Sequence, residues 1–276
     1  MGRVDGKVAL ITGAARSQGR SHAVRLAAEG ADIIAIDACA PIAAAPIPMA
    51  TTDDLAETAR LVEDLDRRVV TWQADVRDTA GMQAAVEAGL AELGHIDIVC
   101  ANAGIFPTAS LMDTTDEVWS EVIDVNLTGV FKTIRAVAPS MIERGEGGSI
   151  IITSSSAGIK GVPNTAPYTS SKHGVVGLMR TLANELAPHR IRVNTVHPTG
   201  VDTIMIQNEP TYRLLLPDAD TPTQEQAIPI FQAMNALPVP WVEVSDVSNA
   251  ILFLASDESR YVTGSMLPVD AGMTQK

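Results

Sequence analysis

A tyrosine and a lysine stand one helical turn apart in this chain, as Tyr168 and Lys172. Side chains four residues apart lie on the same face of a helix. An ammonium group held there favours the phenolate over the phenol, which lets the tyrosine accept or donate a proton far below its ordinary pKa of about 10. Three serines, Ser154 to Ser156, precede this pair, and a hydroxyl arriving from a strand end can hydrogen-bond the reacting oxygen. These residues predict proton transfer at an oxygen of a small molecule.

A glycine-rich turn near the N-terminus strengthens this prediction. The expected strand Val8–Thr12 runs directly into Gly13-Ala14-Ala15-Arg16-Ser17-Gln18-Gly19-Arg20. Glycines let the backbone turn sharply and approach a pyrophosphate, which then rests on the N-terminus of the next helix. The acid Asp37 ends the following strand, where a carboxylate can hydrogen-bond a ribose 2′-hydroxyl and repel a 2′-phosphate. The sequence therefore predicts a dinucleotide site that prefers NAD to NADP.

Arg16 is the residue of this turn that argues for the other cofactor. A cation in the glycine loop can pair with the 2′-phosphate of NADP, and it can equally be a solvated or structural cation. The carboxylate of Asp37 is the stronger argument, so NAD is favoured.

Short apolar runs alternate with longer helix-like segments along all 276 residues. The expected strands are Val8–Thr12, Asp32–Ile36, Val69–Ala74, Ile96–Cys100, Ser149–Thr153, Arg192–Val196 and Met266–Val269. The expected helices are Arg20–Glu29, Met82–Leu93, Trp119–Arg144, Ser170–Leu186 and Ser245–Ala255. This alternation predicts an α/β Rossmann fold in a single domain, 1–276, with a doubly wound, parallel, seven-stranded sheet and helices on both faces.

Two segments interrupt the alternation, one at about 38–52 and one at about 204–240. Both leave the carboxyl ends of expected strands, where open α/β sheets bind ligands, although surface loops are the alternative. The second segment is the favoured binding loop, since its apolar side chains predict an apolar pocket for a terpenoid or similar cyclic alcohol. Composition does not separate such a substrate from a steroid or an aliphatic alcohol. The apolar side chains are Ile204, Met205, Ile206, Tyr212, Leu214, Leu215, Leu216, Phe231 and Met234.

Composition restricts the class of protein. A formal charge of −13 argues against binding nucleic acid through its phosphates. Only two cysteines occur, Cys39 and Cys100, which excludes a disulfide framework, and the five histidines show no metal-ligand spacing, so no metal is expected. Neither a signal peptide nor an apolar run long enough to span a bilayer is found, and we expect a cytoplasmic protein with no membrane partner.

The order of these motifs resembles the short-chain dehydrogenase/reductase family over essentially the whole chain. The matching residues are Thr12-Gly13 with Gly19, Asp75, Asn102-Ala103-Gly104, Asn126, Ser155, Tyr168 with Lys172, and the turn His197-Pro198-Thr199-Gly200-Val201-Asp202-Thr203. Ser155 is chosen among the three serines because it stands thirteen residues before Tyr168, which is the usual spacing of the family. The chain departs from the family pattern at two positions. Ser17 stands where the family's glycine loop has its middle glycine, and Ala101 stands where many relatives have a second Asn.

The resemblance implies a role for each matching residue. Tyr168 is the general acid/base, Lys172 lowers its pKa and contacts the nicotinamide ribose, Ser155 hydrogen-bonds the substrate oxygen, and Asn126 holds a water on the proton path. The implied cofactor-binding residues are Gly13, Arg16, Ser17, Gln18, Gly19, Asp37, Asp75, Val76, Asn102, Ala103, Gly104, Tyr168, Lys172, Pro198, Val201 and Thr203. The activity implied is NAD-dependent interconversion of a secondary alcohol and its ketone, carried out by a homotetramer.

A narrower resemblance adds a cofactor property. The glycine turn with Ser21-His22-Ala23, and the insertion after Asp37 with Cys39, are similar to the mycofactocin-coupled, carveol-dehydrogenase-like subfamily. Such enzymes hold NAD so tightly that it does not exchange freely, so the insertion is a candidate lid and an external redox partner is implied. The alternatives are a catalytically silent NAD-binding regulator, an NADP-preferring carbonyl reductase, and a dehydratase or epimerase acting on a nucleotide-sugar. The last of these usually carries a larger C-terminal domain.

Overall fold

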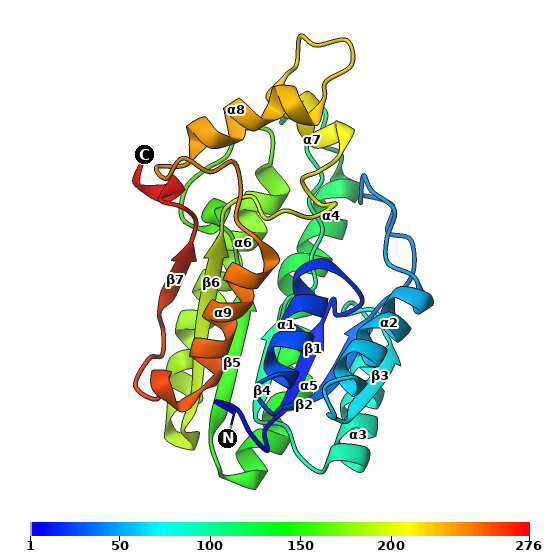
Figure 1. Cartoon of the computed structure of the whole chain (residues 1–276), viewed down its shortest axis with the longest axis vertical. Coiled ribbons are helices and arrows are strands. Elements are labelled where there is room, and N and C mark those ends of the chain that lie inside the picture. Colours follow the sequence, from blue (N-terminus) through cyan, green and yellow to red (C-terminus); the bar gives the residue numbers. More distant parts are fainter. Residues whose placement is uncertain (1) are drawn as a thin grey trace.

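In the computed structural model, which describes residues 2–276, seven strands form one parallel sheet (Figure 1). Their order is β3-β2-β1-β4-β5-β6-β7, so the chain reverses its direction of travel across the sheet between β1 and β4. The strands are β1 (Val8–Thr12), β2 (Asp32–Asp37), β3 (Val69–Gln73), β4 (Ile98–Ala101), β5 (Gly148–Thr153), β6 (Ile191–Pro198) and β7 (Met266–Val269). All seven predicted strands are confirmed, with ends that differ by at most two residues. Such a reversal is where open α/β sheets bind ligands.

Helices cover both faces of the sheet. They are α1 (Ser17–Ala27), α2 (Thr52–Glu63), α3 (Thr79–Leu93), α4 (Asp116–Ile123), α5 (Gly129–Arg144), α6 (Ala166–Glu185), α7 (Glu209–Leu215), α8 (Gln224–Met234) and α9 (Val244–Ala255). One apolar core lies against α3, α5 and α6, and another lies against α1, α2 and α9. Alternate residues of each strand feed the two cores, so Leu10 enters the first and Ile11 the second. Each such fully buried side chain stabilises the fold by about 1.5–3 kcal/mol.

Several helix predictions need correction. Helix α2 lacked a prediction, and it begins after Thr51 because the Thr51 and Asp54 side chains cap one another's backbone N–H groups. The expected helix Trp119–Arg144 is wrong as one α-helix, since a π-helical turn, Asp124–Thr128, separates α4 from α5. The segment 204–240 is likewise not a plain loop, because it folds into α7 and α8 beyond the carboxyl end of the sheet (Figure 1).

No helix among residues 2–276 is both long and apolar enough to cross a membrane. Within the same described part of the chain, no group of three or more His, Cys, Asp or Glu side chains is arranged to hold a metal ion.

Candidate active site

The predicted catalytic side chains meet in one cavity. Tyr168 and Lys172 come from the first two turns of α6, and Ser155 follows the end of β5, where it caps a 3₁₀ turn. All three line the same cavity, and the Lys172 Nζ lies 5.6 Å from the centre of the Tyr168 ring. The Nζ also donates a 2.8 Å hydrogen bond to the Thr153 carbonyl, which fixes the ammonium beneath the tyrosine. The geometry suits proton transfer at the Tyr168 hydroxyl.

The pKa of Tyr168 differs from the sequence-based expectation. Burial raises the pKa of Tyr168, and a hydrogen bond with Ser155 opposes this only in part. The expected lowering is therefore wrong for the protein's own groups, because removing a phenolate from water outweighs the help that this site gives it. Burial also lowers the pKa of Lys172 to about 8.

Asn126 lies directly behind the catalytic residues and is fully buried. Its amide accepts from the Ile105 N–H and donates to the Ile105 carbonyl, both at 2.9 Å, and it also donates to Ser171 Oγ at 3.3 Å. Asn126 sits within the π-helical turn, where the helix departs from regular α geometry. A Cβ at Gly104 would lie 3.3 Å from Asn126 Oδ1 and 3.6 Å from Lys172 Nζ, so a glycine allows this close grouping. The water-holding role of Asn126 stays a prediction.

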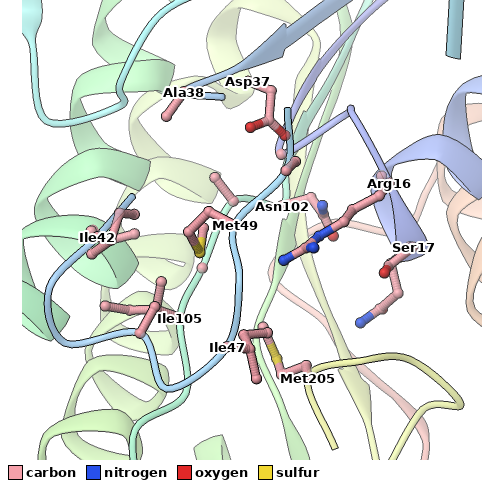
Figure 2. Close-up of a pocket in the computed structure, with 18 of the residues that line it drawn as sticks. Arg16, Ser17, Asp37, Ala38, Ile42, Ile47, Met49, Asn102, Ile105 and Met205 are labelled. Carbon is pink, nitrogen blue, oxygen red and sulfur yellow. The ribbon is translucent and has the colours of Figure 1, made fainter. Parts of the chain in front are cut away.

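A second cavity adjoins the first at the point where the sheet reverses. Figure 2 shows its lining, with side chains converging from the glycine turn, from the end of β2 and from the insertion. The predicted cofactor residues that line it are Gly13, Arg16, Ser17, Gln18, Gly19, Asp37, Asp75, Val76, Asn102, Ala103, Gly104 and Thr203. The others, Pro198, Val201, Tyr168 and Lys172, line the catalytic cavity. Gln18, Asn102, Gly104 and Thr203 belong to both linings, so the two cavities share a wall.

The glycine turn is shaped for close approach of a ligand to the backbone. A Cβ at Gly19 would lie 1.9 Å from the Gly13 carbonyl oxygen, which is too close for any side-chain atom, so this position requires glycine. Gly13 itself has φ +66 and lies close to Ala103. Ser17, the departure from the family pattern, adopts φ +50, so it takes the backbone conformation of a glycine at a cost of about 1–2 kcal/mol. The turn thus leaves room for a pyrophosphate at the start of α1.

Asp37 and Arg16 both line the cofactor cavity but make different contacts. The Asp37 carboxylate accepts from the Ala15 and Cys39 N–H groups, both at 3.1 Å, and lines the cavity beside the glycine turn. Arg16 extends across the cavity and donates a 2.6 Å hydrogen bond to the Pro48 carbonyl of the insertion (Figure 2). This contact favours the structural reading of Arg16 over a 2′-phosphate contact.

The sequence reasoning missed some of the lining. Phe106 packs edge-on against the Tyr168 ring, with 4.6 Å between ring centres, and lines both cavities. Its signal was weak, since it is simply one of four phenylalanines and stands just after the Asn102-Ala103-Gly104 motif. The insertion contributes Ile42, Ile47 and Met49 to the cofactor cavity, which the sequence did not indicate individually.

The segment at about 204–240, called the substrate segment from here on, brings most of its apolar side chains to the catalytic cavity. Those that line it are Met205, Ile206, Leu214, Leu215, Phe231 and Met234. Ile204 lines the cofactor cavity instead, and the Tyr212 hydroxyl donates to Gln207 at 2.8 Å. The wall opposite the catalytic residues is therefore mostly hydrocarbon, which suits an apolar ligand.

Known proteins resemble this chain along its full length. Residues 13–274 match the family model described as Enoyl-(Acyl carrier protein) reductase. A (−)-trans-carveol dehydrogenase of Rhodococcus erythropolis is 52% identical over 277 residues, which cover 100% of both chains. A trans-4-hydroxycyclohexanecarboxylate dehydrogenase of Sinomonas cyclohexanicum is 38% identical over 275 residues, covering 99% of this chain and 94% of that one.

A solved structure agrees closely with the fold described above. Carveol dehydrogenase from Mycobacterium avium, in complex with NAD, matches with a TM-score of 0.98 and 58% identity over 100% of both chains. These similarities cover the glycine turn, the seven-stranded sheet and the catalytic cavity together. The chain belongs to the short-chain dehydrogenase/reductase family.

Proposed function

We propose that this protein is an NAD-dependent oxidoreductase that interconverts a secondary, cyclic, terpenoid-like alcohol and its ketone. The observation that carries the proposal is that Ser155, Tyr168 and Lys172 line a cavity that adjoins the one lined by the glycine turn. NAD is supported by the Asp37 carboxylate, which would repel a 2′-phosphate, and by the NAD complex of the Mycobacterium avium relative.

Bound NAD supplies the acceptor of a hydride in the direction of alcohol oxidation. Tyr168 accepts the alcohol proton at its hydroxyl oxygen, and Ser155 donates a hydrogen bond to the substrate oxygen as negative charge develops there. Lys172, which is itself buried, supplies a positive charge beside the tyrosine ring. An oxidised nicotinamide held in this cavity would add a positive charge, which would favour the phenolate of Tyr168.

The substrate class rests on the apolar wall formed by the substrate segment. A cyclic hydrocarbon alcohol would fill this wall and present its one hydroxyl to Ser155 and Tyr168. The two curated relatives described above are named for oxidising a cyclic alcohol, which supports the same class for this chain.

The insertion at about 38–52 is proposed to be a lid that slows exchange of NAD. Its contacts with the rest of the chain include those of Arg16 with the Pro48 carbonyl and of Glu121, which accepts from the Ala44 N–H at 2.6 Å. Glu121, in the last turn of α4, in turn pairs at 2.8 Å with Arg77 in the connection between β3 and α3. A lid fixed in this way would favour in-place reoxidation of the cofactor by an external redox partner, as the mycofactocin-coupled resemblance implies.

The first experiment combines absorbance and mass analysis of freshly purified protein, before and after addition of carveol without external cofactor. We expect NAD to be present and to become reduced in place. Protein that is cofactor-free and turns over only with added NAD would remove the tight-retention proposal but keep the dehydrogenase. NADP reduced as fast as NAD at equal concentration would instead favour the carbonyl reductase. No reduction with any cofactor across a panel of alcohols and ketones would favour the silent regulator.

Loss of the Glu121 contact tests the lid separately from the chemistry. Glu121→Ala should speed release of NAD by roughly fivefold, because it removes one hydrogen bond that holds the insertion. A hydrogen bond to a charged group contributes about 1.5–3 kcal/mol, and a partly exposed one contributes less, so the expected effect is below tenfold. The measurement is displacement of bound NAD by excess labelled NAD. Glu117→Ala, on an exposed position of the same helix, is the matched control and should leave the rate unchanged. Equal rates in wild type and Glu121→Ala would contradict the lid.

The proposed homotetramer draws support from large apolar side chains left exposed on α4 and α5. Trp119 is 43% exposed and Phe131 is 40% exposed. Such side chains on adjoining helices suit burial against a second copy of the chain.

A further inference from the structure

His197 is a buried histidine that the proposed chemistry does not use. It lies near the end of β6, and none of its surface is exposed. Both ring nitrogens have partners, because Nδ1 lies 2.7 Å from the Ser155 carbonyl oxygen and Nε2 lies 2.8 Å from Thr195 Oγ1. A histidine with both nitrogens engaged has a fixed ring orientation and a fixed tautomer.

The tautomer follows from the partners. A carbonyl oxygen only accepts, so Nδ1 must carry the proton that is donated to Ser155. Nε2 is then the acceptor, and the Thr195 hydroxyl donates to it. Burial lowers the pKa of His197 to about 4, the nearby charges of Lys172 and His173 act in the same direction, and the Ser155 carbonyl and Asp270 act against it. The ring is therefore neutral at ordinary pH, and the donor to Ser155 is permanent.

The contact closes a clamp on the backbone of Ser155. Its carbonyl oxygen accepts from the Gly158 N–H at 2.8 Å as well as from His197, so both lone pairs are used. Its Oγ also accepts from the Ala157 N–H at 3.1 Å. The residue is held in extended backbone, φ −169 and ψ 165, where β5 has ended and no strand pairing supports it. Without His197, one side of this clamp is lost.

We propose that His197 is a positioning residue, which acts through the Ser155 carbonyl to aim the Ser155 hydroxyl at the reacting oxygen and at Tyr168. This rests on the proposed oxidoreductase function, in which Ser155 bonds the substrate oxygen. A shift of about 1 Å in a catalytic group can lower turnover by about 100-fold, so a second residue that fixes Ser155 has a measurable effect.

Two amide substitutions separate the donor from the bulk of the ring. In His197→Asn the amide nitrogen takes the place of Nδ1 and can still donate to Ser155, whereas in His197→Gln it reaches the place of Nε2 and cannot. We expect His197→Gln to lower kcat by about 10- to 100-fold with KM for NAD little changed, and His197→Asn to recover most of that loss. Equal losses in the two variants would overturn the proposal.

A double-mutant test shows whether the effect passes through Ser155. In a Ser155→Ala background, His197→Gln should lower kcat by less than about twofold, because the hydroxyl that it positions is gone. A full additional loss in that background would mean that His197 acts elsewhere, and would also overturn the proposal.

A titration gives a readout that does not depend on turnover. The Ser155 hydrogen bond lowers the pKa of Tyr168, so His197→Gln should raise that pKa toward its value in Ser155→Ala, and His197→Asn should not. Tyrosinate absorbance, taken as the difference from Tyr168→Phe, isolates this group among the three tyrosines. An inactive wild type would contradict the oxidoreductase, while the titration would still decide the role of His197. An unchanged Tyr168 pKa in His197→Gln would refute it.

Discussion

Replacement of Tyr168 by Phe should lower kcat for alcohol oxidation by about 100- to 10,000-fold, while NAD binding stays close to that of wild type. The change removes only the hydroxyl that accepts the proton. The ring, its 4.6 Å edge-on contact with Phe106 and the Lys172 position are kept. Steady-state turnover and NAD binding, measured on the same preparations, check both parts of the expectation.

The control for this variant is Tyr261→Phe, which makes the same chemical change on a side chain that is 90% exposed. It should leave turnover unchanged. The pH profile adds a second check: burial raises the pKa of Tyr168, so the phenolate fraction, and with it kcat for oxidation, should increase with pH in wild type. Tyr168→Phe should lose this dependence. Near-normal turnover in Tyr168→Phe would remove the residue from the mechanism.

Replacement of Gly19 by Ala should weaken NAD binding by about 100-fold. The added Cβ would lie 1.9 Å from the Gly13 carbonyl oxygen and 2.9 Å from the Ala14 Cα, so the turn must move apart where the pyrophosphate is expected. Strain of this kind is of the order of 3 kcal/mol, and each 1.4 kcal/mol is a tenfold change in affinity. Calorimetric titration with NAD measures the loss, and a thermal scan without added cofactor reports whether the fold survives.

The matched control is Gly177→Ala in helix α6, where a Cβ would meet nothing within 4 Å. This variant should bind NAD normally and gain roughly 0.5–1 kcal/mol of stability, since alanine favours the helix. Unchanged NAD affinity in folded Gly19→Ala would show that the glycine turn does not hold the cofactor.

The substrate segment shows what its apolar pattern could predict and what it could not. Its apolar residues predicted an apolar wall, and six of the nine line the catalytic cavity. The pattern did not predict α7 and α8. Pro210 stands at the start of α7, where a proline is tolerated, while Pro229 lies inside α8. The prediction of an apolar wall is therefore confirmed, and the prediction that this segment is a loop is wrong.

The seven strands, the glycine turn and the Tyr168–Lys172 pair could be predicted from the amino-acid sequence, because each depends on neighbours within a few residues. These are a run of buried apolar side chains, a sharp turn and one helical turn. The hydrogen bonds of Arg16 with Pro48, 32 residues away, and of His197 with Ser155, 42 residues away, could be seen only in the folded chain. The same holds for the pKa of Tyr168, which burial raises where the sequence predicted a lowering. Such hydrogen bonds, and the burial of such side chains, form when segments far apart in the sequence pack together. The periodicity of the sequence does not indicate which segment will cover which side chain.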